Sequence, residues 1–448
     1  MRLNYPRTFL LSLAFCGLQV LFAVYNAYMP ILLQAGRPDF DQATPIAGGF
    51  GLSALLTGFV MSLENLAAIM ILPFIGALSD GTASRLGRRK PFLIFGVPIT
   101  ALSFAALPLL LGQPLWLFML AALVFIIFID VIRTPIIALM PDITPSEQRS
   151  QANGVVNLMG GVGAVLAFVI GGALFRTSTT GPFFFGALAL IVGCFIVVAF
   201  LRVPSSRDLA QPPGGLIGRV RAALTSSEQS ALGELRLISR ESDRSTLLLL
   251  GAIFCVFLTY GALTVFFTSF ATDSLGVPRG TESQLLTYFA LSIVVLALPA
   301  GILGARIGRR RTMLIGMLVM GLALAGIGLS ANLLLIRVLL VIAGAGWSMI
   351  GVNALPMVLD SAPTDGVDKL GLYTGIYFIA TQFADVFGPT LVGLFIDLGG
   401  REYRLMFVYV IIALAIAAVL MWRVRSGEAR VGGLETRIGD TAPSDAAL

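Results

Sequence analysis

The sequence predicts an all-α membrane protein with twelve transmembrane helices in two pseudo-symmetric six-helix bundles. Three observations lead to this fold class. First, 57% of the 448 residues are hydrophobic and only 12% are charged, whereas soluble domains carry roughly 25% charge. Second, twelve stretches reach the length of about 20 mostly apolar residues that a transmembrane helix needs. Third, an apolar run that carries a proline and ends in a basic loop occurs once in each half of the chain.

The first of these apolar stretches is too long for a secretory signal and carries Gln19, Tyr25 and Asn26, so it is predicted to be a helix of the mature protein. The stretches predicted to span the membrane are residues 8–33, 52–78, 91–111, 115–139, 151–175, 182–201, 246–271, 283–305, 312–330, 333–359, 370–397 and 403–423. Four domains follow from them, namely an N-terminal bundle at 1–201, a cytoplasmic linker at 202–245, a C-terminal bundle at 246–426 and a disordered cytoplasmic tail at 427–448.

Positive charge is concentrated in loops that the span order places on one side of the membrane. The two strongest clusters are residues 76–90 and residues 301–311. Lys and Arg close to span ends are retained on the cytoplasmic side, so both termini are expected to be cytoplasmic in the bacterial inner (plasma) membrane. The net charge of +6 is therefore explained by membrane orientation, and no nucleic-acid partner is expected.

Composition also restricts the chemistry that the chain can perform. The sequence contains no histidine, and its three cysteines, Cys16, Cys194 and Cys255, lie singly in apolar runs. This excludes histidine-based nucleophile activation and proton relays, and it offers no zinc or disulfide pattern. No enzymatic activity, cofactor or metal is expected, and carboxylates are left as the carriers of a coupling proton or, alternatively, sodium.

Charged residues inside the spans carry the strongest functional signal, because each costs roughly 2.5–3.5 kcal/mol at the bilayer centre. Glu64 and Asp385 lie near the middle of their spans and are predicted to couple transport to a cation. Asp130 is a third candidate, although its i, i+3 spacing from Arg133 also fits a structural ion pair. Arg337 lies one turn from the outer end of its span and is expected to extend toward the interface more readily than to contact substrate.

Polar and aromatic residues at similar depth are predicted to line a central cavity that binds substrate. Each residue taken alone also fits an interhelical hydrogen bond or packing contact. The predicted binding residues are Gln19, Asn26, Tyr260, Thr264, Trp347, Asn353, Tyr377 and Gln382.

The first basic loop resembles a known family signature. Gly76 and Asp80 match its Gly-x-x-x-Asp element, and Arg85, Arg88 and Arg89 supply the basic cluster. This pattern is similar to the signature of the major facilitator superfamily, and its extended form resembles the glycoside-pentoside-hexuronide:cation symporters and the sucrose/proton symporters. The resemblance implies the major facilitator fold.

The same loop is predicted to gate the transporter. The predicted gating residues are Asp80, Arg85, Arg88, Arg89 and Asp142. Asp80 can pair with a nearby arginine and latch one gate state, whereas the second basic loop has Ala305 at the equivalent place, so the latch is expected to be asymmetric. Ile136 and Ile137 follow Pro135 where sucrose symporters carry an arginine, which argues against sucrose itself as the substrate.

The activity expected from these features is symport of a sugar or glycoside with a cation by alternating access, carried out by a monomer in the lipid bilayer. The alternative with the same fold is a proton-coupled exporter of drugs or hydrophobic cations. A non-transporting sensor is a further alternative, and an intramembrane prenyltransferase is disfavoured because the aspartate-rich loops that it needs are missing. The sequence does not define the sugar, the cation or the direction of transport.

Overall fold

The computed structural model describes residues 4–40, 45–82, 84–145, 148–201, 245–361 and 370–425. These residues contain twelve helices that are long and apolar enough to cross a membrane, which confirms the predicted fold class. The helices are α1 (Tyr5–Gln34), α2 (Ala54–Asp80), α3 (Lys90–Ala106), α4 (Leu115–Ile143), α5 (Arg149–Phe175), α6 (Gly181–Phe200), α8 (Ser245–Asp273), α9 (Thr281–Ile307), α10 (Arg309–Leu329), α11 (Leu333–Asp360), α12 (Leu370–Leu398) and α13 (Leu405–Trp422).

Helix ends follow from local chemistry. Helix α1 begins at Tyr5, three residues before the predicted span, because the Asn4 side chain caps it by accepting a hydrogen bond from the Arg7 amide at 3.2 Å. The third predicted span continues past α3 as a short 3₁₀ helix, Leu107–Leu110. Pro108 lies in that turn and has no amide hydrogen with which to extend the α-helical hydrogen bonds.

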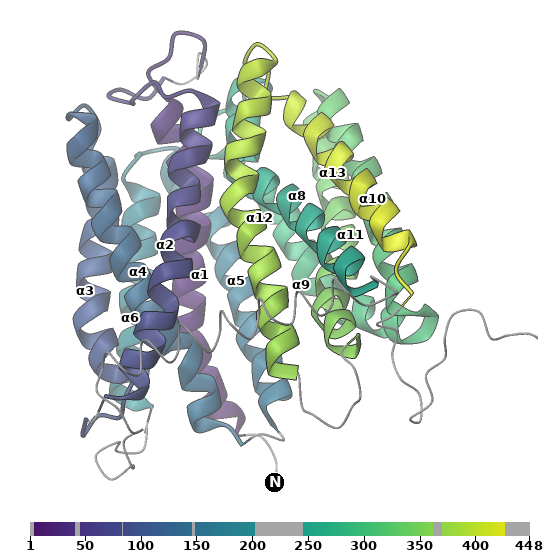
Figure 1. Ribbon diagram of the computed structural model, residues 1–448. Helices are drawn as coiled ribbons and strands as arrows, with labels where there is room; N and C mark the ends of the chain where they lie inside the picture. Colours follow the sequence, from purple (N-terminus) through teal and green to yellow (C-terminus); the bar gives the residue numbers. More distant parts are fainter. Residues whose placement is uncertain are drawn as a thin grey trace, which may run out of the picture.

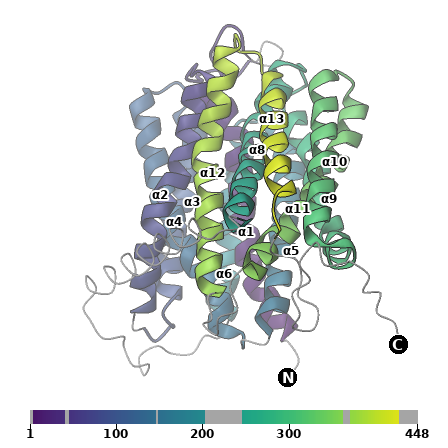
Figure 2. The same ribbon diagram turned by 45° about the vertical axis from the view of Figure 1, so that its right-hand side comes forward.

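Helices α1–α6 form one bundle and helices α8–α13 form the other, with the central helices of both lying side by side (Figure 1). In the view turned by 45°, α12 stands at the front and overlaps helices of the first bundle (Figure 2). The linker and the tail predicted at 202–245 and 427–448 lie outside the described residues, except for Ser245, which begins α8.

Apolar side chains divide between an inner core and an outer, lipid-facing surface. Tyr28, Phe104 and Phe266 are fully buried, whereas Leu298, Leu329 and Leu398 are largely exposed on the outside of the bundles. In water such an apolar exterior would drive aggregation, but in a bilayer it contacts acyl chains at no such cost. The burial pattern therefore agrees with twelve helices that stand in a membrane.

We call the two ends of the molecule the basic end, after its positive charge, and the far end, which is opposite to it. The basic end carries the loop between α2 and α3 and also the first helical residue, Tyr5; the far end carries the loops after α1 and α12. The first described residues lie at the lower edge of Figure 1, which is the basic end. The far-end loops, including Arg37, Asp39 and Arg401, lie at the upper edge.

The bundles contact one another along the far half of the molecule. Gly58 and Gly393 allow α2 to pack directly against the α12 backbone, since an added Cβ would overlap Pro389 or Ala54. In the same seam the Ser62 and Thr390 hydroxyls lie 3.0 Å apart. The far end of the molecule is thereby closed between α2 and α12.

A second seam also closes the far end, where α1 and α5 of the first bundle pack against the C-terminal bundle. Tyr28 of α1 donates to the Ser283 hydroxyl of α9 at 2.7 Å. Gln34 donates to the Ser269 hydroxyl of α8 at 2.9 Å and accepts from Tyr403. Burial raises the pKa of Tyr403, so its hydroxyl keeps the proton that it donates to Gln34.

Candidate functional site

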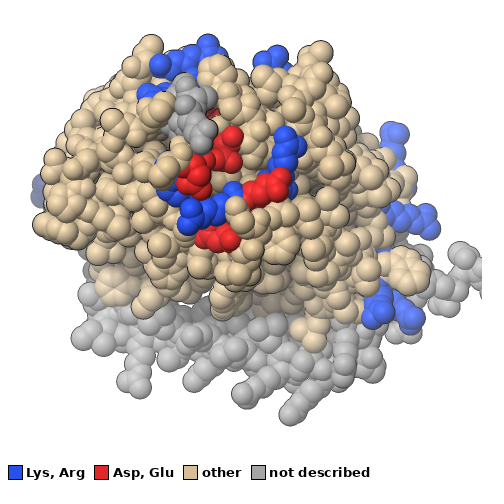
Figure 3. Space-filling model, turned by 90° about the horizontal axis from the view of Figure 1, so that it is seen from above, with Lys and Arg blue, Asp and Glu red and all other residues tan. Residues whose placement is uncertain are grey.

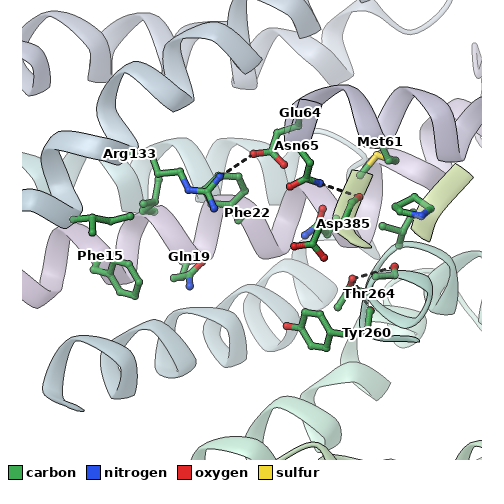
Figure 4. A pocket seen from close by; sticks show the side chains of 16 residues that line it. Phe15, Gln19, Phe22, Met61, Glu64, Asn65, Arg133, Tyr260, Thr264 and Asp385 are labelled. Atoms are coloured by element: carbon green, nitrogen blue, oxygen red, sulfur yellow. Dashed lines mark hydrogen bonds and ion pairs between the residues drawn. The ribbon is translucent and has the colours of Figure 1, made fainter. Parts of the chain in front are cut away.

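A central cavity of about 250 Å³ lies between the two bundles near mid-membrane depth. Its wall is built from α1, α2 and α4 of the first bundle and from α8 and α12 of the second, and Figure 4 shows the lining side chains. The lining residues are Phe15, Leu18, Gln19, Phe22, Asn26, Met61, Glu64, Asn65, Arg133, Ile137, Tyr260, Gly261, Thr264, Val265, Asp385 and Pro389.

An ion pair between α2 and α4 crosses one side of this cavity. The Arg133 guanidinium lies 3.3 Å from a Glu64 carboxylate oxygen and 3.9 Å from an Asp130 oxygen (Figure 4). Its Cζ atom also lies 5.2 Å from the centre of the Phe22 ring. A planar guanidinium suits this position, since it can pair with a carboxylate while its face rests on an aromatic ring.

The sequence left two readings of Asp130 open, and its geometry bears on both. Asp130 is fully buried beside Arg133, and neither of its carboxylate oxygens has a hydrogen-bond partner among the described residues. The distance of 3.9 Å to Arg133 allows an ion pair but no short hydrogen bond. Asp130 lies behind Arg133 and does not line the cavity.

Asp385 lines the same cavity from α12, next to α2. Its backbone carbonyl accepts a hydrogen bond from the Asn65 side chain at 3.4 Å, which joins α2 to α12 beside Glu64. No ion pair links the Asp385 carboxylate to a cation of the described residues. Two carboxylates and one guanidinium therefore share this cavity wall, and Asp385 is the less compensated acid.

Four of the predicted binding residues line the cavity together. Gln19 and Asn26 come from α1, and Tyr260 and Thr264 come from α8. Gln19 and Tyr260 approach the cavity from opposite bundles (Figure 4). Amide and hydroxyl groups beside an aromatic ring are the groups that a sugar-sized polar ligand requires.

The other four predicted binding residues lie off this wall. Trp347 is 8% exposed and stacks behind Tyr260, with ring centroids 4.3 Å apart. Tyr377 joins the same aromatic cluster through Phe257, at a centroid distance of 6.2 Å. Trp347 and Tyr377 therefore support the wall from behind and do not form it.

Asn353 bridges two helices at a distance from the cavity. Its side-chain amide donates to the Met349 carbonyl at 2.9 Å and to the Ala300 carbonyl of α9 at 3.4 Å. Gly304 gives it room, since a Cβ there would overlap the Asn353 side chain. Asn353 therefore forms an interhelical hydrogen bond, as the alternative interpretation expected. Gln382 lies one turn before Asp385 and does not line the cavity.

Sequence reasoning missed several lining residues. Asn65 was detectable, because it follows Glu64 in an otherwise apolar helix. Phe15, Phe22 and Met61 carry no such signal, since apolar residues of this kind occur on every face of these helices. The contribution of Arg133 to the wall depends on its pairing with Glu64, which is 69 residues away in the chain.

The cavity continues toward the basic end. An adjoining cavity of about 190 Å³ shares Phe15 and Ile137 with it and extends along the first turns of α5, where Asn153 and Asn157 lie. Leu11 of α1 and Met140 of α4 line it as well. The far end is closed by the two seams, and both cavities lie on the basic-end side of the closed region.

The predicted gating residues gather at the basic end. Arg88 binds Asp142 through two hydrogen bonds of 3.2 and 2.7 Å, and Arg89 reaches the same carboxylate at 2.9 Å. Arg89 also contacts Asp80 and Ser79. Arg85 is exposed on the same loop. The ends of α2, α3 and α4 are thus held together within the first bundle.

The second bundle repeats part of this arrangement. Arg309, at the start of α10, forms an ion pair with Asp360 at the end of α11. This pair occupies the place that Arg88 and Asp142 occupy in the first bundle. Ala305 stands where the first bundle has Asp80, so this position offers no carboxylate to a neighbouring arginine.

Charged side chains also gather at the middle of the far-end face (Figure 3). Asp39 lies between two arginines there, 3.5 Å from Arg37 and 3.4 Å from Arg401. Asp397 accepts hydrogen bonds from the Ala54 and Leu55 amides at 3.2 and 2.8 Å, which places a carboxylate of α12 at the N-terminus of α2. These contacts join the two bundles at the far end.

Comparison with known proteins agrees with this geometry. The chain is 26% identical over 353 residues to the hippocampus abundant transcript 1 protein of Mus musculus. The aligned region covers 76% of this chain and 65% of that protein. It is 23% identical to the isoprimeverose transporter of Lactiplantibacillus pentosus, covering 78% of this chain and 74% of that protein. It is 25% identical to the class H tetracycline resistance protein of Pasteurella multocida, covering 75% of this chain and 78% of that protein. The chain spans less than two thirds of the length of the first of these relatives.

The fold is also similar to that of solved transporters. The nucleoside transporter NupG superposes with a TM-score of 0.64 at 15% identity, over 93% of this chain and 97% of that chain. The family description "Major Facilitator Superfamily" matches residues 8–283 and 249–440, and these regions include every helix described above. The family match covers most of the chain and agrees with the two-bundle fold, and the chain belongs to the Major Facilitator Superfamily.

Proposed function

We propose that this transporter carries a sugar or glycoside across the bacterial inner membrane together with a proton, by alternating access. The basic end would face the cytoplasm, because it holds both clusters of positive charge at span ends. The observation that carries the proposal is the position of Glu64, Arg133 and Asp385 on one cavity wall beside the polar lining of Gln19 and Thr264. The relative named as an isoprimeverose transporter supports a sugar substrate.

Charge balance suggests how transport could be coupled to a proton. Glu64 has Arg133 as a partner, whereas Asp385 has no ion-pair partner among the described residues. Closing the bundles around an ionised and unpaired Asp385 would be costly in the membrane interior. A proton on Asp385 removes that charge, so closure with the substrate bound would be favoured when the proton is bound too.

The same groups give a path back for the empty carrier. Once substrate and proton have left toward the cytoplasm, Arg133 can turn from Glu64 toward Asp385 as the cavity narrows. The guanidinium then neutralises the charge that the proton neutralised on the loaded carrier. Sodium is the alternative cation, since the Glu64 and Asp385 carboxylates also offer oxygen ligands.

The test is uptake of labelled mono- and disaccharides by proteoliposomes under separately imposed proton and sodium gradients. We expect one sugar to accumulate under the proton gradient, and Asp385→Asn to abolish accumulation while sugar exchange across the membrane persists. Asp39→Asn removes an acid of the far-end loops and should leave accumulation intact. Accumulation that survives in Asp385→Asn would refute Asp385 as the coupling residue, and the lack of any sugar flux would refute the sugar substrate.

A second candidate function is proton-coupled export of drugs or hydrophobic cations. Phe15, Phe22 and Met61 give one side of the cavity an apolar wall, and one relative is named as a tetracycline resistance protein. Extrusion of a lipophilic cation from energised vesicles, without movement of any sugar, would favour this function. The amide side chains of Gln19, Asn26 and Asn65 on the same wall make it the less favoured of the two.

A further inference from the structure

A separate cavity of about 290 Å³ lies at the far end, away from the central one, where α5, α9 and α11 meet. We infer that it binds the phosphate of an anionic membrane phospholipid through Arg176 and Arg337. Thr281, Gln284, Thr287 and Tyr288 complete the polar part of its wall, and Val169 and Leu285 complete the apolar part. The inference depends neither on the sugar nor on the coupling ion.

Arg337 is the first reason for this assignment. Its Cζ atom lies 5.9 Å from the centre of the Tyr288 ring, and its Nε atom is buried without a hydrogen-bond partner among the described residues. The Thr287 hydroxyl beside it is likewise buried and unpartnered within those residues. A buried donor that lacks an acceptor is destabilising. A phosphate oxygen in this cavity would supply the missing acceptor for both groups.

Arg176 is the second reason. It lies at the C-terminal end of α5 and donates to the Gln284 side chain of α9 at 2.5 Å. Neither Arg176 nor Arg337 pairs with a carboxylate of the described residues. Two uncompensated guanidinium groups on one cavity wall match a phosphate, which accepts several charge-assisted hydrogen bonds at once.

The surroundings identify the source of the phosphate as a lipid. Val169, Leu291, Leu334 and Val338 next to the cavity are 44–67% exposed, so this flank of the molecule contacts acyl chains. Arg337 lies one turn inside the end of α11, at the depth where head groups meet the hydrocarbon. Basic pockets between transmembrane helices are known to bind anionic head groups in this way.

The cavity also belongs to one conformation of the carrier. Its wall combines α5 of the first bundle with α9 and α11 of the second. Gly172 allows the close approach of α5, because a Cβ there would meet the Gln284 side chain and the Gly280 carbonyl. Separation of the bundles at the far end would divide the cavity between them. A bound lipid would therefore stabilise the conformation that is closed at the far end.

Native mass spectrometry of the full chain in detergent tests the inference, with phosphatidylglycerol and phosphatidylcholine as probes. We expect the parent to retain phosphatidylglycerol over phosphatidylcholine, and Arg337→Gln and Arg176→Gln each to weaken this binding about tenfold, which corresponds to about 1.4 kcal/mol. Arg423→Gln removes an exposed charge at the end of α13, outside the cavity and outside the contacts between the bundles, and should bind as the parent does. Arg176 is exposed, so its variant is informative even where Arg337→Gln does not fold.

Two results would overturn the assignment. One is phosphatidylglycerol binding that both cavity variants leave unchanged, or that Arg423→Gln weakens equally. The other concerns the source of the phosphate and uses thermal unfolding of delipidated protein. If inorganic phosphate raises the Tm as much as phosphatidylglycerol does, and Arg337→Gln abolishes both effects, the ligand is a free anion and the lipid is excluded. A Tm increase with phosphatidylglycerol alone supports the lipid.

Discussion

Arg133 determines the charge balance of the central cavity. It lies 3.3 Å from Glu64 and 3.9 Å from Asp130, with Asp385 on the same cavity wall. Removing one member of a buried ion pair leaves the other charge uncompensated, which costs about 3–5 kcal/mol. A neutral residue at this position would leave Glu64 and Asp130 without their cation beside the already unpaired Asp385, so the fold itself would be weakened along with transport.

Arg133→Gln is therefore expected to lower the Tm of the purified protein, and the decrease should shrink at acid pH as protons neutralise the acids. Adding Glu64→Gln removes one of the uncompensated charges and should recover part of the lost stability. Thermal unfolding of the parent, both single variants and the double variant checks this. Strictly additive effects in this cycle would show that Glu64 and Arg133 do not interact.

Trp347 acts on the cavity through Tyr260. The two rings stack with centroids 4.3 Å apart and an interplanar angle of 18°, and an aromatic pair is worth about 0.5–1.5 kcal/mol beyond its buried area. Trp347→Ala is expected to weaken substrate binding roughly threefold to tenfold by releasing the Tyr260 ring, while Trp347→Phe retains most of the affinity.

Equilibrium binding of the transported substrate measures this effect. Trp116→Ala is the matched control, because Trp116 is 67% exposed on the outer surface of α4. An unchanged dissociation constant in Trp347→Ala would mean that the Tyr260 ring is held by its other neighbours, such as Phe289 at a centroid distance of 6.5 Å.

At this scale the sequence identified residue types and depths, but it could not identify which residues face the cavity. Tyr260 and Thr264 share one helical face and both line the cavity, whereas Gln382 and Asp385 also share a face and only Asp385 lines it. The rotation of each helix about its axis depends on packing against neighbours that are distant in sequence. For the same reason, the ion pair between Glu64 and Arg133 could not be predicted from local sequence patterns.

The helices α2 and α12 form the seam that closes the far end. Two sets of contacts hold this seam, one near the middle of the molecule and one at its far end. Near the middle, Gly58 and the Pro389 carbonyl touch. At the far end, Asp397 accepts from the Ala54 and Leu55 amides at 3.2 and 2.8 Å. A carboxylate near a helix N-terminus contributes about 0.3–1 kcal/mol, and up to about 2 kcal/mol when partly buried. Asp397 therefore favours the closed far end.

Asp397→Asn is expected to increase the population that is open at the far end, by a factor of up to roughly 30 if the full contribution is lost. Spin labels on Gln113 and Ala331, which are exposed at the far end of the two bundles, would report a longer distance component. Ser53→Ala provides the control, since Ser53 caps the same helix within one bundle, at 3.3 Å from the Leu56 amide. Equal distance distributions in Asp397→Asn and the parent would contradict the prediction.

The basic-end elements show how far a motif can predict structure. The repeated loops predicted equivalent helix junctions, and Arg88 with Asp142 and Arg309 with Asp360 occupy equivalent places. The asymmetry expected from Ala305 remains a prediction, since Ala305 supplies no carboxylate at the place of Asp80. The bond of Arg89 to both Asp80 and Asp142 depends on how α2 and α4 pack together, which the loop sequence does not encode.

For the whole molecule, spans and their pairing into bundles could be read from hydropathy, because the membrane requires every spanning backbone to be helical. The open end could not be predicted in this way. Both conformations of a rocking carrier use the same helices, and they differ only in which half of the interface between the bundles is packed. Here the far half is packed, through contacts such as Ser62 with Thr390 at 3.0 Å.

A reversible covalent bond across that packed half tests the rocking motion directly. The Ser62 and Thr390 side chains touch, so cysteines at both positions should form a disulfide once Cys16, Cys194 and Cys255 have been replaced. We expect oxidation of Ser62→Cys/Thr390→Cys to stop net transport and reduction to restore it, since the far end can no longer open. Substrate binding from the basic end should survive oxidation, because the central and adjoining cavities stay joined on that side.

Each single cysteine variant should transport normally under oxidising conditions. Transport that continues in the oxidised double variant would mean that substrate crosses without separation of α2 from α12, and alternating access between these two bundles would have to be abandoned.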